Sequence, residues 1–307
     1  PTFDISGVTS PDKYRVYKGG VLVEEISGAS TSWTSGTLTD GTYSFTLRSV
    51  DPAGNESADS GALSVTIDTT APAAPSTPDL QSGSDSGSSD SDNKTSVTTP
   101  AFDIAGFGTY FRVYQDAVLA SGNYETASPW TSGALIDGTY GFSATAVDAA
   151  GNESGASSAL SVTIDTDEPD VPVVSSITTD TGNNTSDGIT SDQTLIINGT
   201  AEANSTVEVF EGGVSLGTTA ANGSGNWSYS YEGTTLAEGD YVFTATATDA
   251  SGNTSVSSSD FDVTIDKTGP TATLTSATAD NVINAAEKAA GFSILAHSDE
   301  IGMIYVV

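Results

Sequence analysis

The sequence predicts an all-β protein made of tandem immunoglobulin-like Greek-key β-sandwiches in a linear array. Two observations carry this prediction. Asp-Pro-Ala-Gly-Asn at 51–55 returns in related form at 148–152 and at 249–253, a period near 100 residues that corresponds to one sandwich per repeat. Between these motifs apolar and polar residues alternate, which is typical of strands with one buried face.

The strands of each repeat are expected in the same order. An early strand contains Phe102 and Ile104. The next contains Phe111 and Val113 and leads through a turn to Val118. Both runs alternate with period 2, so we expect these side chains to point into the core.

The last two strands of each repeat are predicted to form a hairpin. Phe243 and Ala245 alternate with threonines in one strand, and Val263 and Ile265 alternate with polar residues in the other. The Asp-x-x-Gly-Asn motif lies between them. Its Gly and Asn readily adopt the positive φ values that tight hairpins need.

Aromatic residues recur at equivalent places in the repeats. Tyr43 and Tyr140 each follow Asp-Gly at the start of the penultimate strand, where sandwich folds often have a tyrosine corner. Trp33, Trp130 and Trp227 occur once per repeat. This recurrence favours a place in the core over a role as a ligand platform.

Clusters of proline and acidic residues mark the predicted domain boundaries. We expect Ig-like repeats at 1–71, 72–168 and 169–268, and a partial repeat at 269–307. The linkers are too short to act as free tethers.

The first and fourth repeats are predicted to be incomplete. The first begins at a strand that matches 102–104, so it lacks a first strand and its loop. The fourth ends after about three strands, and the Asn-x-x-Glu capping pattern at 284–290 predicts one or two helical turns there. We therefore expect the chain to have been cut from a longer protein.

Composition excludes several classes of protein. The 307 residues include 40 Asp and Glu, 8 Lys and Arg and no Cys, for a net charge of -32. Without Cys there are no disulfides, thiolate metal sites or cysteine nucleophiles. Because the chain has so few Lys and Arg side chains, we do not expect it to bind nucleic acid or to dock on a membrane surface. There is no apolar run of membrane-spanning length and no signal segment at the start, so we expect a soluble chain.

The motifs, taken in order, resemble the bacterial Ig-like (Big-type) repeats of giant RTX surface adhesins exported by type I secretion. The resemblance is carried by Thr-Ile-Asp-Thr-Thr-Ala-Pro at 66–72, the Asp- and Ser-rich loop at 84–93, and the Asp-Gly-Thr-Tyr and Asp-Ala-Ala-Gly-Asn strings. It implies a stalk, or extender, at the bacterial cell surface. Such a stalk is secreted, retained at the outer membrane, stiffened by Ca²⁺ at its domain junctions, and carries a distal ligand-binding domain for adhesion or biofilm formation.

The acidic residues fall at predicted ends of the sandwiches, where Ca²⁺ could gather its six to eight oxygen ligands. In this topology the loop after the first strand, the turn before the Tyr-bearing strand and the end of the last strand share one pole. The candidate ligands at that end of the second repeat are Asp85, Asp90, Asp92, Asp137, Asp165 and Asp167, faced by Asp249 and Asn253 of the next repeat; their counterparts elsewhere are Asp40, Asp68, Asp148, Asn152, Asp180, Asp187, Asp266 and Asp280.

The loop that contains Asp85 is itself repeated. Asp85, Asp92 and Thr95 align without gaps on residues 95 positions later, whereas Asp90 aligns with Thr185. An alternative remains for all these acids, and most of all for the hairpin motif: Asp and Asn also form turns by bonding nearby backbone.

Catalysis is not expected. His297 is the single His, so a zinc site would lack a second His ligand. The sequence also contains no Gly-x-Ser-x-Gly elbow, so His297 has no matching nucleophile for a Ser-His-Asp triad. The acids recur in every repeat, whereas an active site is not normally copied three times.

Two other functions stay open beside the extender. One repeat could bind a glycan or a protein through the non-repeated aromatics Tyr110, Tyr124, Tyr229 and Tyr231. The chain could also be an accessory domain of a secreted polysaccharide-active enzyme. As an extender it would be monomeric, its partners would be the neighbouring repeats, and any host or microbial glycan or protein would bind through a domain outside residues 1–307.

Overall fold

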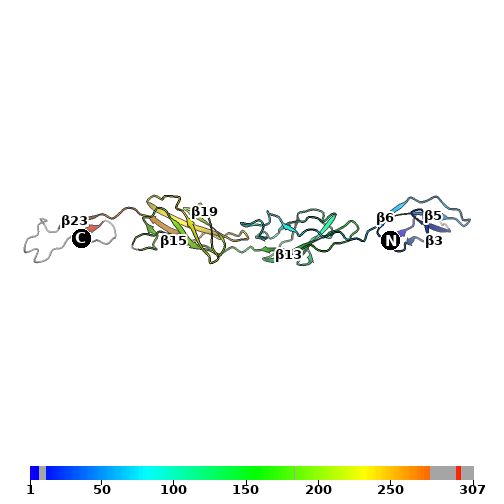
Figure 1. Cartoon of the computed structure of the whole chain (residues 1–307), viewed down its shortest axis with the longest axis horizontal. Helices are drawn as coiled ribbons and strands as arrows, with labels where there is room; N and C mark the ends of the chain where they lie inside the picture. Colours follow the sequence, from blue (N-terminus) through cyan, green and yellow to red (C-terminus); the bar gives the residue numbers. More distant parts are fainter. Residues whose placement is uncertain (7–11, 183, 277–294, 299–307) are drawn as a thin grey trace, which may run out of the picture. The chain divides into compact units, whose positions relative to one another are not determined.

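The computed structural model describes residues 1–6, 12–182, 184–276 and 295–298, and the regular elements in these ranges are β-strands (Figure 1). The chain divides into two compact units, one of Pro1–Asp167 with Ala250–Gly252 and one of Glu168–Asp249 with Asn253–Val307. No helix in the described part of the chain is long and apolar enough to cross a bilayer. The predicted all-β class is confirmed.

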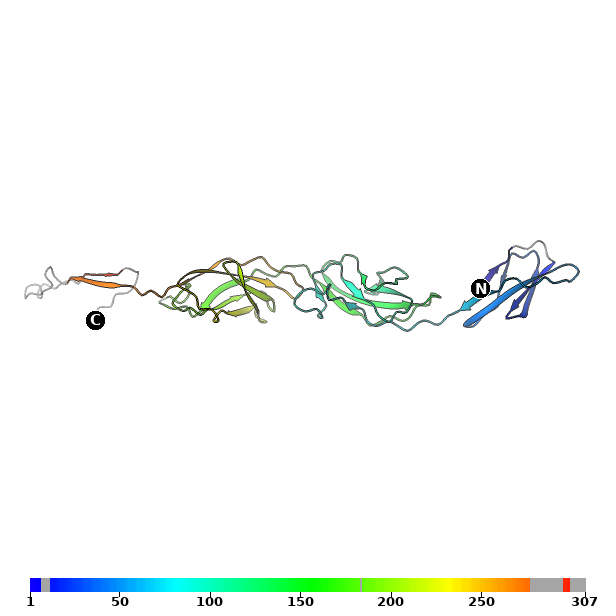
Figure 2. The same ribbon diagram turned by 90° about the horizontal axis from the view of Figure 1, so that it is seen from above.

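The first sandwich, in blue in Figures 1 and 2, has two antiparallel sheets. The smaller sheet pairs β1 (Thr2–Asp4) with β4 (Ser32–Thr34). The larger sheet has the order β3 (Val21–Ser27), β2 (Lys13–Lys18), β5 (Gly41–Val50) and β6 (Leu63–Ile67).

The second sandwich repeats this plan with two additional short strands. One sheet has the order β12 (Trp130–Thr131), β9 (Ala101–Asp103) and β7 (Asp79–Leu80). The other has the order β11 (Val118–Leu119), β10 (Tyr110–Gln115), β13 (Gly138–Val147), β14 (Leu160–Ile164) and β8 (Lys94–Thr95). The chain therefore contributes β7 to one sheet and β8, after a loop, to the other.

The third sandwich has the same topology as the second. Its sheets have the orders β15 (Val173–Thr178), β17 (Ile196–Thr200), β20 (Asn226–Ser230), and β16 (Ile189–Thr190), β22 (Phe261–Ile265), β21 (Gly239–Thr248), β18 (Thr206–Glu211), β19 (Val214–Ala220). The hairpin β23 (Ala272–Ser276) and β24 (Leu295–Ser298) follows. The segment predicted to be helical, 284–290, lies outside the described residues.

The inward positions predicted from alternation form the cores. Phe243, Ala245 and Val263 are almost completely buried in the third sandwich, as are Phe111 and Val113 in the second. Full burial of each large apolar side chain stabilises the fold by about 1.5–3 kcal/mol. Because each sandwich has its own cluster of such residues, each has its own hydrophobic core.

The recurring aromatics lie where the sequence predicts. Tyr43, Tyr140 and Tyr241 each donate a hydrogen bond to the backbone carbonyl four residues earlier, at 2.9, 2.9 and 3.2 Å, which is the tyrosine corner of sandwich folds. Trp33 and Trp227 are buried, and Trp130 is half-buried against the core of the second sandwich.

Candidate cation-binding sites at the ends of the repeats

Each sandwich ties the turn before its Tyr-bearing strand to the segment after its last strand through one acidic residue. In the first sandwich, Asp40 accepts hydrogen bonds from the backbone and hydroxyl of Thr69 and from the hydroxyl of Thr70. In the third, Glu238 accepts a hydrogen bond from the Thr268 hydroxyl at 2.7 Å. We call these contacts the acid–threonine latch. In the first sandwich the Thr69 and Thr70 donors lower the pKa of Asp40.

The second sandwich has a different residue at one position of the latch. Asp137 still accepts hydrogen bonds from the backbone and hydroxyl of Thr166. Asp167, however, stands where the other two sandwiches have Thr70 and Thr268, so a hydroxyl donor is replaced by a carboxylate.

This replacement produces a cluster of three acids. Carboxylate oxygens of Asp137, Asp165 and Asp167 all lie within 4.8 Å of one another. Two oxygens bound to one Ca²⁺ are at most about 5 Å apart, since each Ca–O bond is about 2.3–2.6 Å. The donor set of this cluster therefore fits a hard divalent cation.

The loop between β7 and β8 holds a second acidic feature, centred on a buried carboxylate. Asp85 is only 4% exposed. Its Oδ2 accepts a hydrogen bond from the backbone of Asn93, at 3.2 Å, whereas its Oδ1 has no hydrogen-bond partner among the described residues. A buried carboxylate oxygen without a partner destabilises the fold by about 1–3 kcal/mol or more, so this atom needs an explanation.

Charge in the same loop adds to this cost. Burial raises the pKa of Asp85, and the nearby charges of Asp92 and Asp90 raise it further, against the Asn93 hydrogen bond. Asp92 is exposed and caps the start of β8 by accepting a hydrogen bond from the backbone of Lys94. A cation at Asp85 would offset both burial and repulsion.

The third sandwich reproduces this loop at the predicted offset. Asp180 Oδ2 accepts a hydrogen bond from the backbone of Gly188 at 3.1 Å, and its Oδ1 is again buried without a partner among the described residues. Asp187 accepts a hydrogen bond from the backbone of Ile189, as Asp92 does from Lys94. The same unsatisfied oxygen thus occurs in two independent copies of the loop.

The hairpin acids have a different environment. Asp51, Asp148 and Asp249 each accept hydrogen bonds from the backbone and side-chain nitrogens of the Asn four residues later, which are Asn55, Asn152 and Asn253. These bonds, led by the Asn side chain, lower the pKa of Asp51 and of Asp148. These hydrogen bonds are the turn contacts of the alternative that the sequence left open, and the calcium role of these residues stays a prediction.

The remaining candidates end the last strands. Asp68, Asp165 and Asp266 each accept a hydrogen bond from the backbone two residues later. Asp280 lies outside the described residues. A calcium role for all the candidate ligands stays a prediction.

Two features were missed in the sequence. Glu238 was not predicted as a functional acid because the other two repeats have Asp at this position. Its place directly before the Gly that begins the Tyr-bearing strand was the signal that could have identified it. A surface network of ion pairs in the first sandwich also had no sequence signal, because its members come from separate strands.

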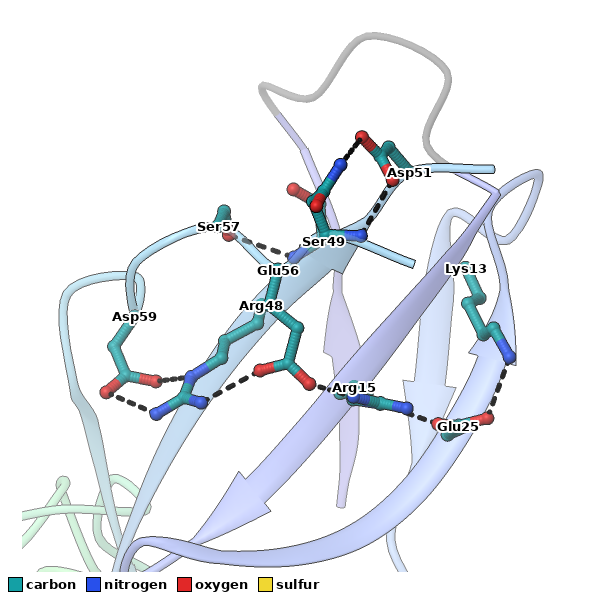
Figure 3. Close-up of polar contacts among 10 residues, drawn as sticks. Lys13, Arg15, Glu25, Arg48, Ser49, Asp51, Glu56, Ser57 and Asp59 are labelled. Carbon is teal, nitrogen blue, oxygen red and sulfur yellow. Dashed lines mark hydrogen bonds and ion pairs between the residues drawn. The ribbon is translucent and has the colours of Figure 1, made fainter. Parts of the chain in front are cut away.

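This network, shown in Figure 3, covers one face of the larger sheet of the first sandwich. Glu25 forms ion pairs with Lys13 and Arg15, and Glu56 forms ion pairs with Arg15 and Arg48. Arg48 also bonds Asp59, at 2.7 Å. The network joins β2, β3 and β5 to the segment before β6.

The non-repeated aromatics fall into two groups. Tyr110 and Tyr124 meet edge to face at 5.3 Å and line a shallow cavity of 300 Å³ with Asp148 and Gly151. Tyr229 and Tyr231 instead pack against the core of the third sandwich. The first pair is therefore the better candidate for a ligand surface.

Comparison with known proteins gives one family and several partial relatives. The family model for the bacterial Ig-like domain matches residues 1–69, 71–166 and 169–267. Chitinase A1 of Niallia circulans is 38% identical over 165 residues, which is 52% of this chain and 22% of that protein. Exoglucanase B of Cellulomonas fimi is 36% identical over 174 residues, which is 52% of this chain and 15% of that protein.

One solved structure in this set is the Ca²⁺-stabilized adhesin with which an Antarctic bacterium binds ice. It is 22% identical, with a TM-score of 0.32, and the match covers 95% of this chain and 75% of that one. The chain spans less than a quarter of the length of the chitinase and of the exoglucanase.

Proposed function

Since the chain belongs to the bacterial Ig-like domain family, we propose that it is an extender segment of a large RTX-type bacterial surface adhesin. Its role is to hold a distal ligand-binding domain away from the cell, for adhesion or biofilm formation. The chain is then extracellular, anchored at the outer membrane through other parts of the protein, and non-catalytic. Its immediate partners are the neighbouring repeats.

The observation that carries the proposal is the repetition of one structural unit together with its acidic loop. The unsatisfied oxygens of Asp85 and Asp180 occupy equivalent places in successive sandwiches. A catalytic or ligand-recognition site is not expected to recur in successive repeats. A site that stabilises the individual repeat is expected to recur.

We propose that Ca²⁺ is the stabilising ion. Asp85 with Asp90 and Asp92 would hold one ion, and Asp137 with Asp165 and Asp167 another. The bound cation supplies positive charge that balances the carboxylates and so holds the loop and the end of the last strand together. The hairpin acids Asp148 and Asp249 contribute less, because both carboxylate oxygens of each already accept hydrogen bonds from the Asn of the turn.

Small-angle scattering and calorimetry in Ca²⁺ and in chelator test the proposal. Binding to the folded state alone raises stability by RT ln(1 + [Ca]/Kd), or about 2.7 kcal/mol per site at a hundredfold excess over Kd. We expect a longer, stiffer particle and higher melting temperatures in Ca²⁺. An identical length and identical melting temperatures in both buffers would refute it.

A second function is favoured by the pair of the half-buried Tyr110 and the exposed Tyr124. Tyr110 and Tyr124 border a cavity of 300 Å³ beside Asp148, and aromatic faces with nearby polar groups suit carbohydrate rings. The names of the two relatives, a chitinase and an exoglucanase, fit a module that accompanies a polysaccharide-active enzyme. Glycan-array binding that is lost in both Tyr110→Ala and Tyr124→Ala would favour this function, and no binding would leave the extender.

A further inference from the structure

The third sandwich contains a further copy of the hairpin turn, between β19 (labelled in Figure 1) and β20, and this copy begins with Asn222. The backbone N–H of Asn222 donates to the carbonyl of Asn226 at 2.9 Å, and the N–H of Gly225 donates to the carbonyl of Asn222 at 2.8 Å. The turn at 148–152 has the same two bonds between the same positions. Gly225 has a φ of 80°, and Gly151 at the equivalent place has a φ of 93°. The two turns therefore have the same backbone.

The turn at Asn222 has an amide where the turns at Asp51, Asp148 and Asp249 have a carboxylate. In those three turns Oδ2 of the Asp accepts a hydrogen bond from the side-chain nitrogen of the Asn four residues later, at 2.8, 2.8 and 2.9 Å. Asn222 has an NH₂ group in place of this oxygen. Because the side-chain nitrogens of Asn222 and Asn226 are both donors, they cannot bond each other. The turn at Asn222 thus lacks one hydrogen bond that the other copies have.

The side chain of Asn222 is held beside the peptide that follows it. Its Oδ1 accepts hydrogen bonds from the backbone N–H groups of Ser224, at 2.9 Å, and of Asn226, at 3.1 Å. The bond to Ser224 folds the side chain over the intervening peptide, which brings Cγ to the side of the Gly223 nitrogen. The two donors also stabilise the negative charge that Oδ1 gains when a nucleophile adds to Cγ, as an oxyanion hole does.

The nitrogen of Gly223 is suited to be that nucleophile. Within the described part of the chain its N–H has no hydrogen-bond acceptor, and the residue is exposed, so water can take its proton. Glycine also has no side chain to hinder the close approach of the backbone. The other three turns have Pro52, Ala149 and Ala250 at this position. Proline has no N–H to lose, and the methyl group of alanine obstructs the approach.

We propose that Asn222 and Gly223 form a self-modification site, at which the folded chain converts Asn222 into an aspartate. The Gly223 nitrogen loses its proton and bonds to Cγ, and the bond between Cγ and Nδ2 breaks, so that ammonia leaves and a succinimide ring remains. Water then adds to Cγ, the bond between Cγ and the Gly223 nitrogen breaks, and this nitrogen regains a proton. The net reaction consumes a water molecule and releases ammonia, with no oxidant or reductant.

The turn favours aspartate over isoaspartate, the other product of ring opening. Isoaspartate forms when water adds to the main-chain carbonyl of Asn222 instead, and it lengthens the main chain by one carbon. This added carbon would disrupt the backbone pairing of Asn222 with Asn226. Aspartate keeps the pairing, and its new oxygen can accept the side-chain nitrogen of Asn226, as Asp148 accepts that of Asn152. The product is therefore the turn that the chain already has at 148–152.

The other Asn-Gly pair of the chain is a matched control. Asn198 and Gly199 lie inside β17, where Gly199 pairs with Val174 on one side and with Trp227 on the other. Oδ1 of Asn198 accepts a hydrogen bond from the Ser228 hydroxyl at 2.8 Å, on the neighbouring strand. Because successive side chains of a strand stand away from the extended backbone, Cγ of Asn198 is not held against the next peptide. We expect no conversion there.

Mass spectrometry of the full chain, incubated in mildly alkaline buffer and then digested, tests the proposal. In heavy-oxygen water the fragment with Asn222 should lose ammonia and gain one heavy oxygen atom, at least ten times faster than the fragment with Asn198. The ratio of aspartate to isoaspartate should be higher in the folded chain than in a free peptide of residues 219–229, in which no hairpin opposes a longer main chain.

Two glycine variants locate the cause of the reaction. A Cβ at Gly223 would meet nothing closer than Oδ1 of Asn204, at 4.0 Å, and a Cβ at Gly233 would meet nothing within 4 Å. Both Gly223→Ala and Gly233→Ala should therefore fold normally. We expect Gly223→Ala to convert at least ten times more slowly and Gly233→Ala to convert at the wild-type rate.

The variant Asn222→Asp reproduces the product and tests its effect on the turn. It should raise the melting temperature of the third sandwich, and adding Asn226→Ala should remove the increase. Equal rates at Asn222 and Asn198, a rate that Gly223→Ala does not slow, or a product ratio no higher than in the peptide would each overturn the proposal. A lower melting temperature of Asn222→Asp would overturn it as well.

Discussion

The acid cluster of the second sandwich makes a prediction that can be tested by exchanging one residue between repeats. Asp167→Thr gives the second sandwich the residue that the first and third have at this place, and Thr70→Asp gives the first sandwich the cluster of the second. The pair tests whether a single side chain decides between a hydrogen-bonded latch and a cation site.

The magnitude follows from the distances. Two unit charges 4.8 Å apart in water repel by about 0.9 kcal/mol, and at about 0.15 M salt screening removes roughly half of this. Asp167→Thr removes two of the three repulsive pairs, about 1 kcal/mol at that salt concentration. A restored hydroxyl donor to Asp137, like the one that Thr70 gives to Asp40, adds to this gain.

Differential scanning calorimetry of the full chain in chelator should therefore show Asp167→Thr melting higher in the second sandwich. For a domain of this size about 1–2 kcal/mol corresponds to roughly 5–10 °C. Equilibrium dialysis should show one fewer Ca²⁺ bound per chain. Thr70→Asp should have the opposite effects in the first sandwich: a lower melting temperature in chelator and a new dependence on Ca²⁺.

The result that refutes the reasoning is specific. If Asp167→Thr in chelator melts at or below the wild-type temperature, repulsion within the cluster is not a significant cost. If Thr70→Asp lowers stability equally in Ca²⁺ and in chelator, three converging carboxylates are not enough to bind the ion.

The remaining predictions concern the loop, the core and the hairpins. Asp85→Asn removes a buried charge, so it should raise the unfolding free energy in chelator by about 1–2 kcal/mol. In Ca²⁺ the same variant should be less stable than wild type, and calorimetry in both buffers measures the two effects. Lower stability of the variant in chelator would contradict the assignment. Gly199→Ala places a methyl group against the carbonyl of Val173 and the ring of Trp227, so the third sandwich should lose at least about 3 kcal/mol in chemical denaturation, and near-neutral stability would show that the strands can separate there. The pKa of Asp148 is lowered in the folded state, so this residue contributes stability above its unfolded pKa of about 3.9, and that stability is lost as the pH falls toward the lower folded pKa. In Asp148→Ala the melting temperature should therefore fall less steeply with decreasing pH on the acid side. An unchanged slope would mean that the Asn152 contacts add nothing to stability.

Much of the fold is determined by local sequence. Alternation placed Phe243 and Val263 on the buried face because a one-residue slip would turn the whole strand over. The tyrosine corner was predictable because Tyr140 must reach a carbonyl only four residues away. The repeated spacing of the loops also aligned Asp85 with Asp180. Because the two residues hold equivalent positions in equivalent loops, each accepts a hydrogen bond from the backbone eight residues later.

Other features depend on residues that only folding brings together. The sequence named Asp85, Asp137 and Asp148 as candidate ligands and left a turn role open most of all for Asp148. In the structure the first is buried, the second accepts hydrogen bonds from Thr166, and the third accepts hydrogen bonds from its own turn. Composition cannot distinguish them, because the difference is which donors lie within hydrogen-bonding distance.

The sequence by itself therefore determined the all-β class and the order of the main strands within a repeat, since these follow from periodicity and turn chemistry along the chain. Only the tertiary structure decided which carboxylate oxygens lack partners among the described residues and which carboxylates lie close enough to form a cluster. Both depend on contacts between segments far apart in sequence, such as β8 with β14 and Asp137 with Thr166.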